Sequence, residues 1–67
     1  MKRLSVELGR AHTAVRGRDA YTLLVAVGAR PIWSPISRAW MAQRYQGSDV
    51  LALAEARGYV TDVREAA

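Results

Sequence analysis

The 67-residue sequence contains no cysteine and only one histidine, His12. Without cysteine the chain has no disulfide, no thiolate ligand for a metal ion and no thiol nucleophile. A single histidine also leaves no His/Cys cluster of the kind that binds zinc. We therefore expect no metal ion and no other cofactor, and we expect no catalytic role for His12.

The sequence also lacks a long hydrophobic run. Its longest stretch without a charged residue runs only from Ala20 to Ala29, whereas a membrane-spanning helix needs about 20 apolar residues. Glu7 and Arg10 interrupt the segment that follows the basic start of the chain, so this segment does not have the pattern of a secretory signal. These features predict a cytoplasmic protein that does not contact a membrane.

Acidic residues are few: six Asp and Glu against ten Lys and Arg give a formal net charge of +4. Asp19 and Asp49 occur where helices are expected to begin, and the other carboxylates are scattered, so no pair is placed for acid–base chemistry. The sequence therefore predicts a protein that is not an enzyme. Its basic balance favours phosphate backbones or acidic protein surfaces as partners, although a GC-rich genome would also enrich arginine.

The first third of the chain contains one strand pattern and one helix pattern. Residues 4–8 alternate between apolar and polar, which is typical of a half-buried strand. Residues 9–18 are rich in Gly and Arg and are expected to form a basic loop, although 13–15 could extend a strand. Asp19 is a suitable N-cap for a helix over 20–27, which the next glycine would end.

A second segment repeats this helical design. An offset of 30 residues relates Asp19 to Asp49 and Gly28 to Gly58, and a strand-like run follows each glycine. Ser48 is the expected N-cap of the second helix. The sequence therefore predicts two copies of a helix-to-strand unit, although any two capped helices that end in glycine would align to some extent.

Residues 33–47, between the two units, fit two interpretations. A Ser-Pro pair is a suitable start for a helix over 35–46, but the apolar residues there do not share one helical face. The alternative is a β-hairpin that turns at 35–38, since Pro is favoured at the second position of a type I turn. In that register Trp33 lies opposite Trp40, which stabilises the pair of strands. We favour the hairpin.

The expected order is strand, helix, strand, strand, helix, strand. This is the split βαβ arrangement of the ferredoxin-like class, an α+β fold in which two helices cover one face of an antiparallel sheet. The length fits a single domain over 1–67 with a frayed tail at 64–67. If 35–46 were helical instead, the chain would be a three-helix bundle, and 48–57 would be a candidate recognition helix of a helix-turn-helix protein.

The stretch 28–40, GARPIWSPISRAW, resembles a short motif of small domains related to the HARP domain of annealing helicases. Similar modules occur beside primases and plasmid-transfer proteins. The matching positions are Gly28, Ala29, Arg30, Trp33, Pro35, Arg38 and Trp40. The sequence departs from the motif by inserting Pro31-Ile32 and by placing Ser34 where an acidic residue is common. The resemblance implies a helix-to-hairpin corner and contact with nucleic acid.

Tryptophan and arginine are the residues that could bind a partner, because aromatic rings stack on bases and arginine pairs with phosphates. The candidate nucleic-acid-binding residues are Arg10, Arg16, Arg18, Trp33, Arg38, Trp40 and Arg44. The alternative is that the tryptophans belong to the core of a domain that has no Phe and that the arginines are simply solvated.

Two functions therefore stay open. The first is a small, non-enzymatic accessory module that binds nucleic acid, DNA or RNA. The second is a protein-interaction or regulatory module of phage or plasmid type, which acts as a homodimer or on a host protein because a thin core and an open sheet face favour association.

Overall fold

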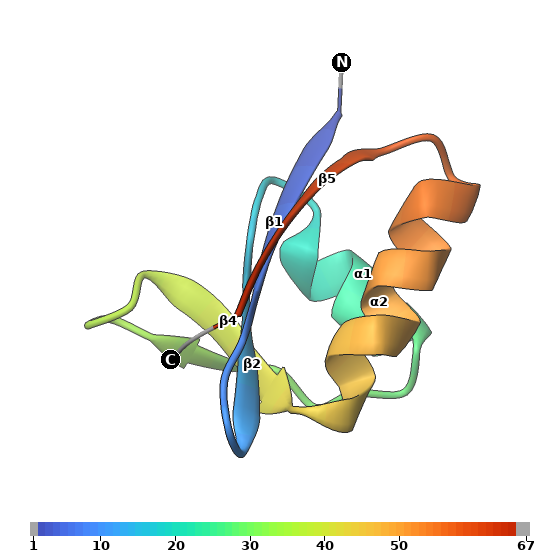
Figure 1. Ribbon diagram of the computed structural model, residues 1–67. Coiled ribbons are helices and arrows are strands. Elements are labelled where there is room, and N and C mark those ends of the chain that lie inside the picture. The colour runs from blue at the N-terminus through green and yellow to red at the C-terminus, as the bar shows by residue number, and fades with distance from the viewer. Residues whose placement is uncertain (1, 66–67) are drawn as a thin grey trace.

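The computed structural model describes residues 2–65 as a five-stranded sheet with two helices (Figure 1). In chain order the elements are β1 (Arg3–Leu8), β2 (His12–Arg16), α1 (Ala20–Ala26), β3 (Ile32–Ser34), β4 (Ala39–Gln43), α2 (Tyr45–Ala56) and β5 (Val60–Glu65). The strand order across the sheet is β3-β4-β2-β1-β5. β5 is parallel to β1, and every other neighbouring pair is antiparallel. The fold is therefore α+β with a mixed sheet.

The predicted strand order is wrong near the start of the chain, because the expected basic loop contains β2. Thr13, Ala14 and Val15 are all buried, so the middle of this segment is a strand inside the sheet, and only its two ends carry basic residues. β1 lies between β2 and β5 and separates two strands that run in opposite directions. The predicted ferredoxin-like arrangement with an antiparallel sheet is wrong for the same reason.

Both helices cover the same face of the sheet (Figure 1), as expected. The largest fully buried side chains come from both layers: Leu4, Val6 and Val15 from the sheet, and Leu23, Leu24 and Val50 from the helices. The helix pattern of α1 places three of its seven residues in this core. Residues 64 and 65, which were expected to belong to a frayed tail, are part of β5. Residues 66 and 67 lie outside the described residues.

The two helices end in the same way, which confirms the predicted repeat at these positions. Gly28 and Gly58 have φ angles of 86° and 83°. The amide of Gly28 donates to the carbonyl of Val25, and the next amide donates to Leu24; the same two bonds recur exactly 30 residues later around Gly58. This is the Schellman motif, in which a left-handed residue ends the helix. The 30-residue offset therefore relates two equivalent helix ends.

The two helix starts differ from each other and from the prediction. Asp19 is the N-cap residue of α1, but its side chain makes no capping hydrogen bond. The predicted cap Ser48 is wrong, because α2 begins at Tyr45 and contains Ser48 in its first turns. Gly47 permits this earlier start, because without a side chain the first turns of α2 can approach the sheet closely. A Cβ atom on Gly47 would lie 2.5 Å from Leu8 Cδ2 and 3.1 Å from Thr13 Oγ1.

The hairpin prediction is confirmed, and with it the pairing of the strands. Trp33 lies opposite Trp40, and Ile32 lies opposite Met41. The turn occupies 35–38, where Arg38 adopts a φ of 52°. β3 has only three residues, and the amide of Ser37 in the turn donates a hydrogen bond to Ser34 Oγ at its end. The helical alternative for 35–46 is wrong except at its last two residues, which begin α2.

Candidate nucleic-acid interface

Three aromatic side chains from three different elements form one cluster. The ring of Trp40 in β4 lies 4.8 Å from that of Tyr21 in α1 and 5.3 Å from that of Trp33 in β3, measured between ring centroids. The interplanar angles are 56° and 64°, which is the tilted, edge-on geometry that aromatic pairs prefer. We call Tyr21, Trp33 and Trp40 the aromatic cluster.

The cluster is part core and part surface. Trp40 is partly buried and packs against the hydrophobic core. Trp33 and Tyr21 are 47% and 49% exposed. Each tryptophan therefore fits a different one of the two interpretations. Trp40 supports the core, and Trp33 presents its ring at the surface.

The strand register explains why the cluster forms on the helix-covered face. Val6, Val15, Trp40 and Trp33 are successive cross-strand partners, so their side chains share one face of the sheet. The first two are buried under the helices, and the last lies at the edge strand. α1 turns its buried side, with Leu23 and Leu24, toward the centre. Tyr21 therefore lies on the flank of α1 that faces the hairpin.

Arg18 and Arg38 both lie at one end of the sheet. β2 and β3 are both antiparallel to β4, so they run in the same direction. Arg18 follows the end of β2 and precedes the first turn of α1, which carries Tyr21, and Arg38 is in the turn that follows β3. Both side chains are exposed, and neither is in an ion pair with another residue of 2–65.

Arg16 has a structural role on the opposite, open face of the sheet. Its Nε and Nη2 atoms donate to the carbonyl oxygen of Ser37 at 3.2 and 3.1 Å, and its Nη1 donates to Glu7 Oε1 at 3.3 Å. The side chain therefore links β1 to the hairpin turn. These contacts use three of the five N–H donors of the guanidinium, which the sequence interpretation had assigned to phosphate.

Replacing Arg16 with alanine is expected to lower the free energy of unfolding by about 1–3 kcal/mol, because hydrogen bonds of a charged donor are lost from a partly buried site. Urea denaturation of the variant measures this change. The matched control is Arg10→Ala, which removes the same charge from an exposed position at the β1–β2 turn and is expected to change stability by less than about 0.5 kcal/mol. Equal effects of the two substitutions would contradict the structural role of Arg16.

The other two predicted residues, Arg10 and Arg44, lie at the far end of the sheet. Arg10 is in the turn between β1 and β2, and Arg44 precedes α2. Arg44 Nη2 lies 3.6 Å from Glu65 Oε1 at the end of β5. The seven predicted residues therefore do not form one site, and Trp33, Trp40, Arg18 and Arg38 are those that the fold brings to one region.

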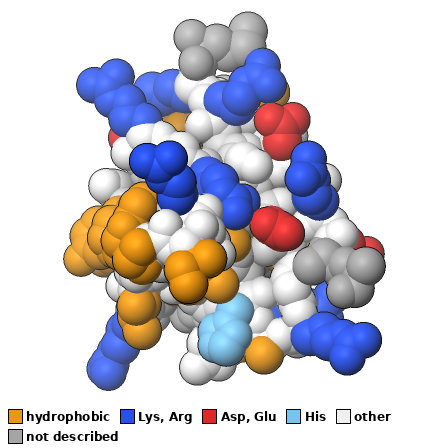
Figure 2. Space-filling model, turned by 90° about the vertical axis from the view of Figure 1, so that its left-hand side faces the viewer, with side chains coloured by type: hydrophobic (Ala, Val, Ile, Leu, Met, Phe, Trp, Pro, Cys, Tyr) orange, Lys and Arg blue, Asp and Glu red, His pale blue; other side chains and the backbone are white. Residues whose placement is uncertain are grey.

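The open face of the sheet is mixed in character (Figure 2). Hydrophobic side chains gather on one side of this view, and basic side chains are spread over the rest with a few acidic ones among them. The hairpin contributes Ile32 and Ile36, which are 72% and 96% exposed. This face therefore carries an apolar corner at the hairpin and no continuous basic surface.

Tyr59 connects β5 to the start of α1. Its hydroxyl donates a hydrogen bond to Asp19 Oδ2, and the ammonium of Lys2 lies 5.4 Å from the centre of its ring. The hydrogen bond to Asp19 raises the pKa of Tyr59 above the ordinary 10.0; desolvation and the charge of Asp19 act in the same direction, and Arg57 opposes them. The carboxylate of Asp19 therefore serves this contact instead of capping α1.

This contact predicts a loss of stability in alkali. A raised pKa in the folded state means that folding favours the protonated phenol, so the contribution is complete below the unfolded pKa of 10.0 and disappears as the pH rises through the folded value. Spectrophotometric titration of tyrosinate, together with urea denaturation across the alkaline range, measures both effects. In Asp19→Asn the pKa of Tyr59 should fall back toward 10.0. An unchanged titration curve in that variant would contradict the assignment.

Two further classes of feature are absent from the part of the chain that the structure describes. Within residues 2–65 no three His, Cys, Asp or Glu side chains come together in a way that could hold a metal ion. None of the helices there has both the length and the apolar character that crossing a membrane requires.

The chain was also compared with known protein families, proteins and structures. No model of a protein family, no curated protein and no solved structure matches the chain. The resemblance of residues 28–40 to the HARP-related motif therefore stays a prediction.

Proposed function

We propose that the protein is a small, non-enzymatic nucleic-acid-binding module that holds a single strand on the aromatic cluster. The observation that carries this proposal is the pair of half-exposed rings, Trp33 and Tyr21, which are 47% and 49% exposed and pack against the same Trp40. Rings fixed by packing give up little conformational entropy when a base stacks on them. Such stacking stabilises binding by about 1–3 kcal/mol per base.

The proposal specifies single-stranded nucleic acid because a protein ring must reach the face of a base. Bases in a duplex are stacked on each other and paired, so a protein ring gains access to a base face only in a single strand or at an unpaired end. Arg18 and Arg38 supply positive charges for the phosphate backbone of the strand. Both are exposed, and both lie at the end of the sheet where α1 begins and the hairpin turns. The net charge of +4 supports the approach of a polyanion.

The test is a fluorescence-anisotropy titration of labelled oligonucleotides at about 50 and 200 mM salt, with a single strand and its duplex compared. Two arginine–phosphate contacts predict that log affinity falls by about 1.4 per unit of log salt for the single strand. We expect the duplex to bind more weakly. Equal or tighter binding of the duplex, or no binding of either, would refute the proposal.

A second candidate function is contact with a protein partner, either a second copy of this chain or a host protein. It is favoured by Ile32 and Ile36, which are 72% and 96% exposed on the same short hairpin. Exposed apolar groups that occur together commonly mark an interface. Sedimentation equilibrium tests self-association: a dimer that the substitution Ile36→Asp dissociates supports this function, and a monomer at all concentrations excludes the homodimer.

A further inference from the structure

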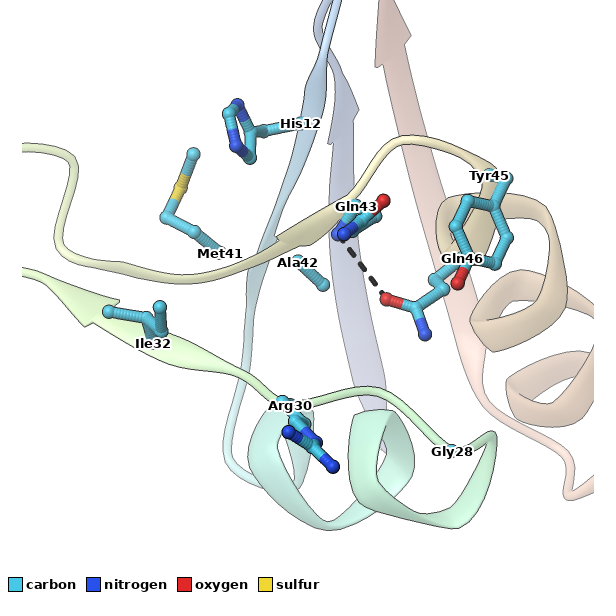
Figure 3. A pocket seen from close by; sticks show the side chains of 9 residues that line it. All are labelled: His12, Gly28, Arg30, Ile32, Met41, Ala42, Gln43, Tyr45 and Gln46. Atoms are coloured by element: carbon cyan, nitrogen blue, oxygen red, sulfur yellow. Dashed lines mark hydrogen bonds between the residues drawn. The ribbon is translucent and has the colours of Figure 1, made fainter.

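A separate groove lies at the other end of the sheet from Arg18 and Arg38 (Figure 3). It has a volume of about 620 Å³ and is bounded by the end of β4, the segment that joins α1 to β3, and the start of α2. This volume is in the range of about 300–1,000 Å³ that is usual for small-molecule sites. No Asp or Glu lines the groove. The site therefore favours a ligand that is anionic or rich in hydrogen-bond acceptors.

The groove exists because β3 is shorter than β4. β3 begins at Ile32, opposite Met41, so the last two residues of β4 have no strand neighbour on that side. The side chain of Gln46 enters this gap, and its Oε1 accepts the backbone N–H of Gln43 at 3.3 Å. Gln46 therefore satisfies an amide that a longer β3 would have paired.

This hydrogen bond also fixes the direction of the Gln46 amide. Because the oxygen faces β4, the Nε2 group faces the groove (Figure 3). The side chain is only 7% exposed, and its Nε2 donates no hydrogen bond to any other residue of 2–65. No buried side-chain nitrogen or oxygen of residues 2–65 lacks a hydrogen-bond partner, so this nitrogen is open to solvent in the groove, where an acceptor on a ligand can reach it.

Arg30 adds the charge that selects the ligand. Its side chain is exposed, lines the same groove and is in no ion pair with another residue of 2–65. A guanidinium and an amide N–H group together suit a phosphate, since hydrogen bonds from charged donors to phosphate are short and strong.

The remainder of the lining suits a flat ring. The aromatic ring of Tyr45 and the apolar side chains of Met41 and Ile32 border the groove, and the exposed Gln43 amide offers both a donor and an acceptor. A glutamine amide can form two hydrogen bonds with the edge of adenine. We propose that the groove binds a nucleoside monophosphate, with its phosphate on Arg30 and Gln46 and its base against the ring of Tyr45.

This site goes beyond the proposed function, because it uses none of the residues of the aromatic cluster. A free mononucleotide and one nucleotide of a strand present the same chemistry to the groove. The two sources differ in whether a short oligoadenylate binds there more tightly than adenosine monophosphate does.

The test is an NMR titration of the ¹⁵N-labelled protein with adenosine monophosphate, adenosine or inorganic phosphate, in which the side-chain NH₂ signals of Gln46 and the backbone amide signals of Gln43 and Tyr45 are followed. The backbone signals measure the affinity of Gln46→Glu, which has no side-chain NH₂ group. We expect adenosine monophosphate to shift these signals saturably and to bind more tightly than either fragment. Arg30→Ala and Gln46→Glu should each weaken binding at least tenfold, in line with the loss of a hydrogen bond to a charged group. Gln46→Glu keeps the acceptor for the Gln43 amide, so the fold is preserved while the donor is removed.

The control is Arg57→Ala, which removes the same charge at the other end of α2 and should leave binding unchanged. Tighter binding of hexa-deoxyadenylate than of the monophosphate at Gln46 would identify a strand as the source, and the reverse order would identify a free nucleotide. Unmoved Gln46 signals at about 10 mM of every probe, or binding that both variants retain, would overturn the inference. Arg30→Ala should keep strand binding at the aromatic cluster, so failure here is distinct from failure of the proposed function.

Discussion

Replacing Trp33 with alanine is expected to weaken the binding of a single-stranded oligonucleotide by about ten- to a hundredfold, which corresponds to the loss of one stacked base. Trp33 is the ring of the aromatic cluster that the edge strand β3 presents, and nearly half of its surface is exposed. Trp33→Phe should lose less affinity, because a smaller ring still offers a face for stacking. Fluorescence anisotropy with a labelled oligonucleotide measures both affinities.

Two controls separate binding from folding. Trp33→Ala also removes an aromatic pair from the hairpin, at a cost of about 0.5–1.5 kcal/mol in stability, so circular dichroism must establish that the variant is folded at the assay temperature. Ile36→Ala removes an apolar side chain from the turn of the same hairpin. This side chain is 96% exposed and does not belong to the aromatic cluster. A loss of affinity in Ile36→Ala equal to that in Trp33→Ala would move the binding surface to the hairpin tip.

Replacing Gly47 with valine is expected to destabilise the fold by about 1–3 kcal/mol, which is the usual cost of overpacking a well-packed site. Gly47 is buried where α2 meets β1 and β2, and even a Cβ atom there would come within 2.5 Å of Leu8 Cδ2. Thr13 cannot easily move away, because its hydroxyl donates a hydrogen bond to the Glu7 carbonyl. For a domain of this size, such a loss is a large part of the total stability.

The matched control is Ala52→Val, which introduces the same β-branched residue at an exposed position of the same helix. Its cost should be limited to the difference in helix propensity, below about 1 kcal/mol. Gly47→Ala is expected to fall between the two, because alanine favours the helix while its methyl group presses on Leu8. Urea denaturation measures all three, and a Gly47→Val variant as stable as Ala52→Val would contradict the close approach of α2 to the sheet.

The features that could be predicted from the sequence are those that neighbouring residues determine. The hairpin follows from a Ser-Pro pair that favours a turn and from two tryptophans that meet when it forms, and the structure pairs Trp33 with Trp40 in the expected register. The helix ends follow from Gly28 and Gly58, because few other residues adopt a positive φ easily.

The features that could not be predicted depend on partners far away in the sequence. The strand at His12–Arg16 is buried only because β1 and β4 flank it and the helices cover it. The parallel pairing of β1 with β5 joins the two ends of the chain, and no local pattern indicates it. Ser48 was predicted to be the N-cap of the second helix, yet α2 begins at Tyr45 and includes Gly47, where the helix approaches Leu8 and Thr13 of the sheet.

The candidate site shows the same division. The two tryptophans were identified because aromatic rings can stack on bases, and the predicted cross-strand pairing made them neighbours. Tyr21 was not predicted to belong to the site. The one signal that could have indicated an exposed ring is its position in the helix, which lies outside the buried face formed by Leu23 and Leu24. The arginines could not be sorted from the sequence, since only the fold reveals that Arg16 binds Ser37 and Glu7 while Arg18 and Arg38 stay exposed.

The measurement that addresses the binding surface most directly is an NMR titration of the protein with a short single-stranded oligothymidylate, in which the two indole N–H signals and the backbone amides are followed together. We expect the indole signal of Trp33 to move most, with the amides around Tyr21 and Arg38 next and those around Arg10 and Arg44 hardly moving. Shifts confined to the open face or to the Arg10 end of the sheet, with the signal of Trp33 unmoved, would contradict the assignment of the aromatic cluster as the nucleic-acid interface.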